Sequence, residues 1–143
     1  MKRRSILVLA AIILVASIAV PLYINSVKKA HTLPINVDDV SQIGFFISPD
    51  TDGNYTITDR SSVAAIIDAL NQLDLTTESN QYDSNSLYSM AVYYTDGSFT
   101  QITISGEDKI AIGREGTREK IYETDCRELI LACQEAYHAK FLS

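Results

Sequence analysis

The stretch LYSMAVYYTDGSFTQITIS, residues 87–105, decides the fold, because it predicts two long antiparallel strands joined by a tight turn. Apolar and polar residues alternate on both sides of Asp96-Gly97, a pair that favours hairpin turns. Two turns fit this pair: a two-residue loop, and a three-residue loop in which Gly97 takes the left-handed conformation. The two turns differ in register by one residue, so the choice decides which side chains share a face of the sheet.

The register of this hairpin follows from which turn joins apolar side chains across the strands. The two-residue loop would place Met90 opposite Thr103, whereas the three-residue loop places Met90 opposite Ile102. Cross-strand apolar pairs stabilise a sheet, so we predict the three-residue loop. In this register Tyr93 pairs with Phe99 on the opposite face.

Four shorter strands are predicted outward from the hairpin, and they bring the number of strands to as many as six. Alternation and turn-forming neighbours predict them at residues 40–48 (VSQIGFFIS), 55–58 (YTIT), 109–112 (KIAI) and 119–123 (EKIYE). Residues 76–86 are polar throughout and predict a loop.

Two amphipathic helices are predicted, over residues 59–73 and 126–141. Asp59 has the chemistry of an N-cap for the first helix. Asp125 and Glu128 have the spacing of an N-terminal cap and its reciprocal partner for the second. The first helix carries its apolar residues at helical spacing, at Val63, Ile66, Ile67, Leu70 and Leu73.

The order of these elements predicts an α+β domain over residues 40–143, with two layers. We expect one antiparallel sheet of five or six strands, with both helices packed on one face. The motif TDGNYT at residues 51–56 recurs as TDGSFT at residues 95–100. Two explanations stay open: a duplicated hairpin-plus-helix unit, and the repeated use of one turn motif.

A membrane anchor is predicted at the beginning of the chain, from Ile6 to Ile24. These 19 residues are interrupted only by Ser17 and Pro21, and as a helix they would span about 28 Å, close to the hydrocarbon thickness of a bilayer. A cleavable signal has a shorter apolar stretch and then turns polar, whereas here the apolar residues continue. We therefore expect a retained single-pass helix in residues 1–30 and a linker over residues 31–39. A signal cleaved before Val20 is the alternative.

The basic residues predict the orientation of this helix and exclude nucleic acid as a partner. Lys2, Arg3, Arg4 and the amino terminus outweigh Lys28 and Lys29, which favours a cytoplasmic N-terminus and a domain outside the cell membrane. Five of the twelve basic residues thus lie before residue 31. Residues 31–143 contain the remaining seven basic residues and all eighteen acidic residues, so their net charge is −11. Such a charge repels phosphate backbones.

No catalytic, cofactor-binding or metal-binding residues are predicted. Cys126 and Cys133 are seven residues apart on one helix, too far for a disulfide, and fit small buried side chains. His138 lies near the end of the last helix, where the helix dipole favours a cation. Asp50 and Asp52 resemble the opening of a calcium loop, but the glycine and glutamate that should follow are missing.

Aromatic residues supply the one candidate binding surface of the sequence. Tyr93, Tyr94 and Phe99 cluster beside the Asp96-Gly97 turn. Such a cluster marks a binding surface if one face of the sheet stays uncovered. The pairing of Tyr93 with Phe99 across the strands explains these residues without a partner, and both interpretations stay open.

The chain from residue 40 onward resembles small extracytoplasmic domains of Gram-positive bacteria. The resemblance rests on the pattern I-x-F…DG-x-x-x-I-T-D…I-I-x-x-L and on the tyrosine-rich Asp-Gly hairpin that follows it. Those domains follow an N-terminal membrane helix or lipid anchor and mostly have no assigned activity. The resemblance implies no catalytic residue. From the predicted anchor, the acidic single-domain body and the absence of a catalytic constellation, we expect a membrane-anchored binding or accessory module without catalytic activity. Its expected partners are the lipid bilayer, through Ile6 to Ile24, and an unidentified protein.

Two alternatives accompany this expectation. The first is a secreted, signal-cleaved protein, such as an inhibitor that presents the Asp96-Gly97 hairpin to its target. The second is a cell-envelope hydrolase that uses His138 or the acidic turn at Asp52.

Overall fold

The computed structural model describes residues 33–46, 54–81, 86–114 and 116–142, which belong to one compact unit of the chain. The predicted anchor from Ile6 to Ile24 and the acidic turn at Asp50 and Asp52 lie outside the described residues, as does the first half of the TDGNYT motif. Within the described ranges, no helix is both long enough and apolar enough to cross a membrane.

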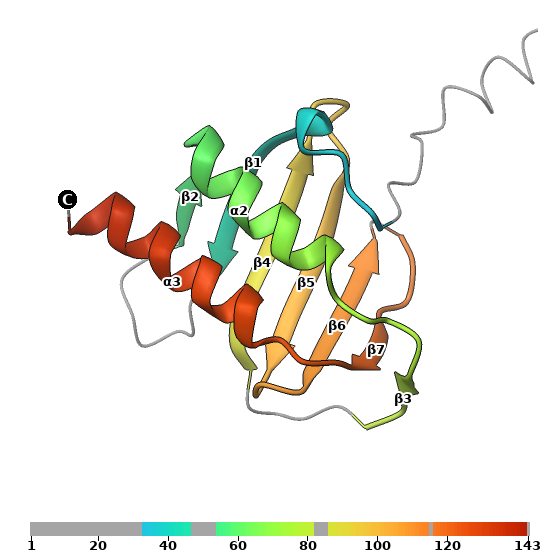
Figure 1. The fold of residues 1–143 in the computed structure, drawn as a ribbon. Helices are drawn as coiled ribbons and strands as arrows, with labels where there is room; N and C mark the ends of the chain where they lie inside the picture. The colour runs from blue at the N-terminus through green and yellow to red at the C-terminus, as the bar shows by residue number, and fades with distance from the viewer. Residues whose placement is uncertain (1–32, 47–53, 82–85, 115, 143) are drawn as a thin grey trace, which may run out of the picture. The chain divides into compact units, whose positions relative to one another are not determined.

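An antiparallel sheet of seven strands forms one layer of the domain, in the order β2-β1-β4-β5-β6-β7-β3 (Figure 1). Its strands are β1 (Val40–Phe46), β2 (Tyr55–Ile57), β3 (Glu78–Ser79), β4 (Ser86–Tyr94), β5 (Phe99–Ser105), β6 (Lys109–Arg114) and β7 (Lys120–Glu123). All six pairings between neighbouring strands are antiparallel. The predicted α+β class is therefore confirmed.

The hairpin of β4 and β5 has the predicted register. Met90 lies opposite Ile102, and Tyr93 lies opposite Phe99. The backbone N–H of Tyr94 donates to the carbonyl of Ser98 at 2.9 Å, so three residues form the turn. Gly97 has φ of +80°, the left-handed conformation that this turn requires.

The described part of the sheet has one strand more than the five or six predicted. The additional strand is β3, which lies inside the segment that we expected to be a loop. Glu78 and Ser79 pair with Tyr122 and Ile121 at the outer edge of β7. Two polar residues carry no alternation, so tertiary pairing alone makes this strand.

Two helices, α2 (Arg60–Asn71) and α3 (Arg127–Phe141), pack against each other and lie in front of one face of the sheet (Figure 1). Asp59 caps α2 as predicted, because its carboxylate accepts from the N–H of Ser62 at 2.9 Å. The predicted cap of α3 is confirmed only in part. Cys126 holds the N-cap position and its side chain makes no capping bond, whereas the carboxylate of Asp125 accepts from the backbone N–H of Arg127 at 3.1 Å and also pairs with its guanidinium.

The hydrophobic core lies between the helices and the sheet. Alternate strand residues such as Ile43, Phe45, Met90 and Ile104 face it and are almost fully buried. From the helices it receives Val63, Ile66, Ile67, Leu70, Cys126, Leu129, Cys133 and Ala136. Leu73, predicted on the same face of the first helix, packs against this cluster while partly buried.

The described part of the expected linker packs against the domain. Ile35 is only 5% exposed, and Val37–Asp39 form a short 3-10 helix before β1. The side chain of Asn71 bonds both backbone groups of Ile35: its oxygen accepts from the N–H at 2.7 Å and its amide donates to the carbonyl at 2.8 Å. The end of α2 thus holds the segment that leads to the sheet.

Candidate functional site

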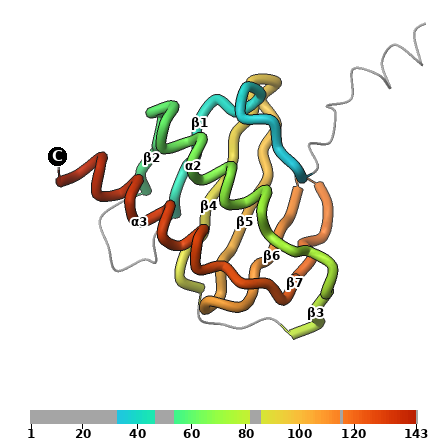
Figure 2. The backbone as a smooth tube through the Cα atoms, viewed as in Figure 1, coloured from blue at the N-terminus to red at the C-terminus, as the bar shows by residue number. Residues whose placement is uncertain are grey.

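A cavity of about 450 Å3 lies at the β6–β7 end of the sheet, and segments far apart in the sequence converge on it. Figure 2 shows the N-terminal segment, in blue, and the chain that leaves α2, in green, approaching this end. Leu33 and Ile35 come from the first and Leu75 from the second. The remaining lining residues come from β5, β6, β7 and the turn that joins β6 to β7.

The pocket lies on the helix-covered face of the sheet. In the pairing of the strands, Ile112 lies opposite Ile102, which belongs to the core, and Arg114 lies opposite Thr100. Lys120 lies opposite Ile112 on the next strand. Residues that pair directly across antiparallel strands share a face. Cations therefore occupy core-facing positions at the end of this face where the pocket lies.

Apolar side chains make up half of the described lining of the pocket. Ile35 is buried, whereas Leu33, Leu75, Ile112 and Tyr122 are only partly buried and pack at the margin of the core. A ligand with an apolar body would cover them further, and removal of that surface from water favours binding.

Three cations also line the pocket: Arg114, Arg118 and Lys120. The Nζ of Lys120 donates to a carboxylate oxygen of Glu78 at 2.8 Å, and this hydrogen bond and charge raise the pKa of Lys120. Both side chains are about 60% exposed, so the ion pair contributes little and is readily exchanged for another anion. Neither arginine forms an ion pair with a carboxylate of the described residues.

Two threonines complete the polar lining and also fix its geometry. The hydroxyl of Thr100 lies 2.9 Å from that of Tyr94, whose pKa is raised by burial. The hydroxyl of Thr117 donates to the carbonyl of Arg114 at 3.0 Å and accepts from its N–H at 3.1 Å. These two bonds hold the backbone from which the Arg114 side chain extends.

The arrangement is suited to binding an anion. Guanidinium and ammonium groups donate charge-assisted hydrogen bonds to carboxylates and phosphates. Among the described lining residues there is no carboxylate, imidazole or thiol that would serve as a general base or a nucleophile.

The residues of the predicted aromatic surface do not lie together. Tyr93 and Phe99 are partly exposed on the face away from the helices, with ring centroids 6.0 Å apart. Tyr94 is 3% exposed and belongs to the core on the other face. Adjacent residues of a strand point to opposite faces, so Tyr94 is not part of a surface with Tyr93.

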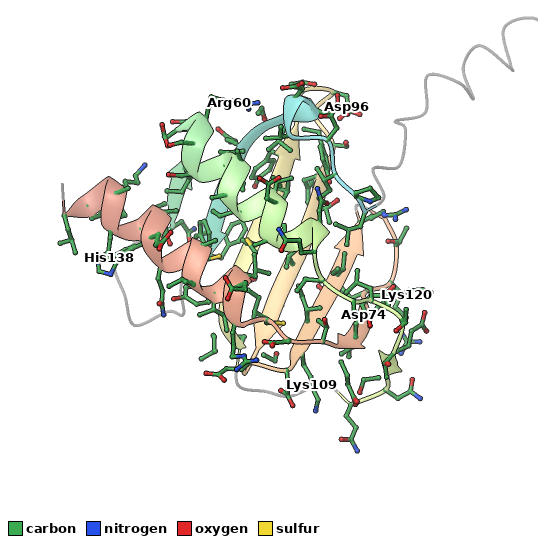
Figure 3. The ribbon with its side chains drawn as sticks, in the orientation of Figure 1. Arg60, Asp74, Asp96, Lys109, Lys120 and His138 are labelled. Carbon is green, nitrogen blue, oxygen red and sulfur yellow. The ribbon has the colours of Figure 1, made fainter. Side chains whose placement is uncertain are left out.

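The other candidate residues lie away from the pocket. His138 is exposed in the last turn of α3, at the far end of the molecule from Lys120 (Figure 3). Cys126 and Cys133 are fully buried and free, and burial raises the pKa of their thiols to about 11 and about 12. In the ranges that the structure describes, no three His, Cys, Asp or Glu residues are placed to hold a metal ion.

The pocket was not among the sites predicted from the sequence, although the sequence carries a signal for it. Residues 113–120, GREGTREK, contain glycines and basic residues but lack the Gly-Lys-Ser/Thr ending of a phosphate-binding loop, so no sequence motif reveals the pocket. The useful signal is alternation: Ile110 and Ile112 face the core, and Arg114 continues the same face. No protein-family model, curated protein or solved structure matches this chain.

Proposed function

We propose that this protein is a membrane-anchored binding module that acts outside the cell membrane and catalyses no reaction. A helix from Ile6 to Ile24 spans the bilayer once, with the N-terminus in the cytoplasm. The domain that follows it binds its ligand in the pocket lined by Arg114, Arg118 and Lys120.

The pocket is the observation that carries the binding role. It has a volume within the range of small-molecule sites, and it combines an apolar wall with a few convergent polar groups. Its described lining offers several hydrogen-bond donors and contains no carboxylate, imidazole or thiol. Such a lining supports binding rather than hydrolysis.

The sequence supports the anchor. Nineteen apolar residues match the thickness of a bilayer, and Tyr23, Lys28 and Lys29 follow them as interfacial residues do. Retention of the segment distinguishes this proposal from a secreted protein.

Fractionation of membranes tests the anchor. Membranes containing the full chain are washed with alkaline carbonate, and the intact mass of the protein is then measured. Retention in the membrane with the N-terminal residues present supports the proposal. Release by carbonate, or a mature chain that begins at Val20, would replace it with a secreted protein.

Protection from protease tests the orientation. A protease added to intact cells should degrade the domain, because the proposal places it outside the membrane. A chain with Arg3→Glu and Arg4→Glu serves as the matched control, since the positive residues set the orientation and their loss should reduce this accessibility. Degradation only after the cells are opened would contradict the orientation.

A further inference from the structure

The pocket lies in a molecule whose charge is otherwise strongly negative. Beyond residue 30 the chain has seven basic residues, and three of them line this one cavity. The other four are Arg60, Lys109, Arg127 and Lys140. None of the described acidic residues lines the pocket. The site is therefore a local concentration of positive charge within a body of net charge −11.

The other arginines are engaged elsewhere. Arg127 forms an ion pair with Asp125 at 2.5 Å, and Arg60 donates to the carbonyls of Val37 and Val40. Arg114 and Arg118 have no such partner among the described residues, while both line the cavity. Guanidinium donors next to an open cavity are available to a ligand.

The charge of the whole domain limits the size of an anionic ligand. A polyanion such as nucleic acid, or an extended anionic surface, would meet the repulsion of the acidic body. A small molecule with one charged group enters the cavity and meets the three cations without facing the rest of the surface. The partly buried apolar residues of the lining, such as Leu33, Leu75 and Tyr122, favour a ligand that also carries an apolar part.

We propose that the pocket binds a small amphipathic anion, with one phosphate or carboxylate group on a compact apolar body. Arg114, Arg118 and Lys120 hold the oxyanion, and Leu33, Leu75 and Ile112 contact the apolar part. This proposal rests on the pocket being the binding site of the module proposed above, and it adds the chemical class of the ligand. A free metabolite and a lipid headgroup both supply this chemistry.

Titration of the full-length protein in detergent tests the ligand class. Phenyl phosphate is the amphipathic probe and benzoate its carboxylate counterpart, while inorganic phosphate and benzyl alcohol represent the two halves separately. We expect saturable binding of phenyl phosphate or benzoate that is tighter than that of either half. Equal affinity for one of the halves, or no saturable binding of either amphipathic anion, would overturn the proposal.

Variants locate the site. Arg118→Gln should weaken the binding of the amphipathic probe by about tenfold, because it removes a charge-assisted hydrogen bond. Arg114→Gln should do the same. Arg127→Gln is the matched control, since it removes the same charge outside the pocket and should leave the affinity unchanged. An equal loss in Arg127→Gln would mean that general charge, and not this cavity, attracts the anion.

A separate variant tests the apolar contact. Leu75→Ala should weaken the binding of phenyl phosphate and leave the binding of inorganic phosphate unchanged. The opposite pattern would contradict the contact between Leu75 and the apolar part of the ligand.

A short-chain phosphatidic acid, compared with phenyl phosphate, distinguishes the two sources of the ligand. Tighter binding of the phosphatidic acid identifies a lipid headgroup, and tighter binding of phenyl phosphate identifies a free metabolite. Carbonate extraction reports on the anchor alone, so failure of the anchor and failure of this ligand class give different results.

Discussion

Asn71 fixes the beginning of the domain through both groups of its side-chain amide. Its two bonds to the backbone of Ile35, at 2.7 and 2.8 Å, join the last residue of α2 to the segment before β1. Ile35 is buried at this point, so its backbone groups have little access to water as an alternative partner. The Asn71 side chain therefore satisfies both backbone groups of Ile35, as a neighbouring strand would.

Replacement of Asn71 by alanine should destabilise the domain. It removes two hydrogen bonds and leaves the backbone groups of Ile35 without them, so we expect the free energy of unfolding to fall by about 2 kcal/mol. Urea denaturation measures this. Gln72→Ala, at the exposed neighbouring position, is the control and should change stability by less than about 0.5 kcal/mol. An equal effect of both variants would show that the bonds to Ile35 do not matter.

The two cysteines should be unreactive while the protein is folded. Burial raises the pKa of Cys126 to about 11 and that of Cys133 to about 12, and only a thiolate reacts with an alkylating reagent. At about pH 8 the folded thiols therefore stay protonated, whereas unfolded ones, with a pKa of about 8.5, ionise in part.

Mass spectrometry after exposure to iodoacetamide tests this. The native protein should remain unmodified over a time in which the protein in concentrated urea gains two adducts. Rapid modification of the native protein would contradict the burial of α3 against the sheet.

Gly97 fixes the register of the hairpin formed by β4 and β5. Its φ is +80°, and a Cβ placed there would meet no other atom within 4 Å. The cost of a substitution is therefore that of the backbone conformation alone.

Gly97→Ala should lower the free energy of unfolding by about 1 kcal/mol, because alanine is disfavoured in the left-handed region. Gly97→Asn is the matched control and should lose less, since asparagine adopts that region more readily. The midpoints of urea denaturation of the two variants measure this difference in stability. A larger loss for asparagine than for alanine would mean that the side chain, and not φ, governs this turn.

The elements with strong local signals could be predicted from the sequence. The β4–β5 hairpin follows from alternation and turn chemistry, and α2 follows from its apolar spacing and its cap at Asp59. The strand β3 could not be predicted, because Glu78 and Ser79 become a strand only by pairing with β7. At the start of α3, the carboxylate of Asp125 accepts from the backbone N–H of Arg127 and also pairs with its guanidinium, and the ion pair could not be predicted from the capping pattern.

The pocket could be predicted only in part. Cations at core-facing positions of β6 and β7 indicate that the helices leave this part of the sheet uncovered. These positions can be identified from the sequence once both strands and their register are known. The contributions of Leu33, Ile35 and Leu75 depend on where α2 ends above the sheet. Sequence periodicity does not report that position. The burial of Tyr94 was predictable, because alternation separates it from Tyr93.

At the scale of the whole molecule, an acidic domain concentrates three of its cations in one amphipathic cavity. The proposed anchor would keep this cavity at the outer surface of the cell membrane. We therefore propose both a location outside the membrane and a pocket that is available to small anions.

Labelling of intact cells with a membrane-impermeant, photoreactive derivative of phenyl phosphate tests both claims most directly. We predict that cells expressing the full chain give adducts on peptides that contain Leu75 or residues 112–122, and that Arg118→Gln greatly reduces these adducts while Arg127→Gln does not. Adducts that form only after the cells are opened, or that lie elsewhere in the chain and persist in Arg118→Gln, would contradict the account.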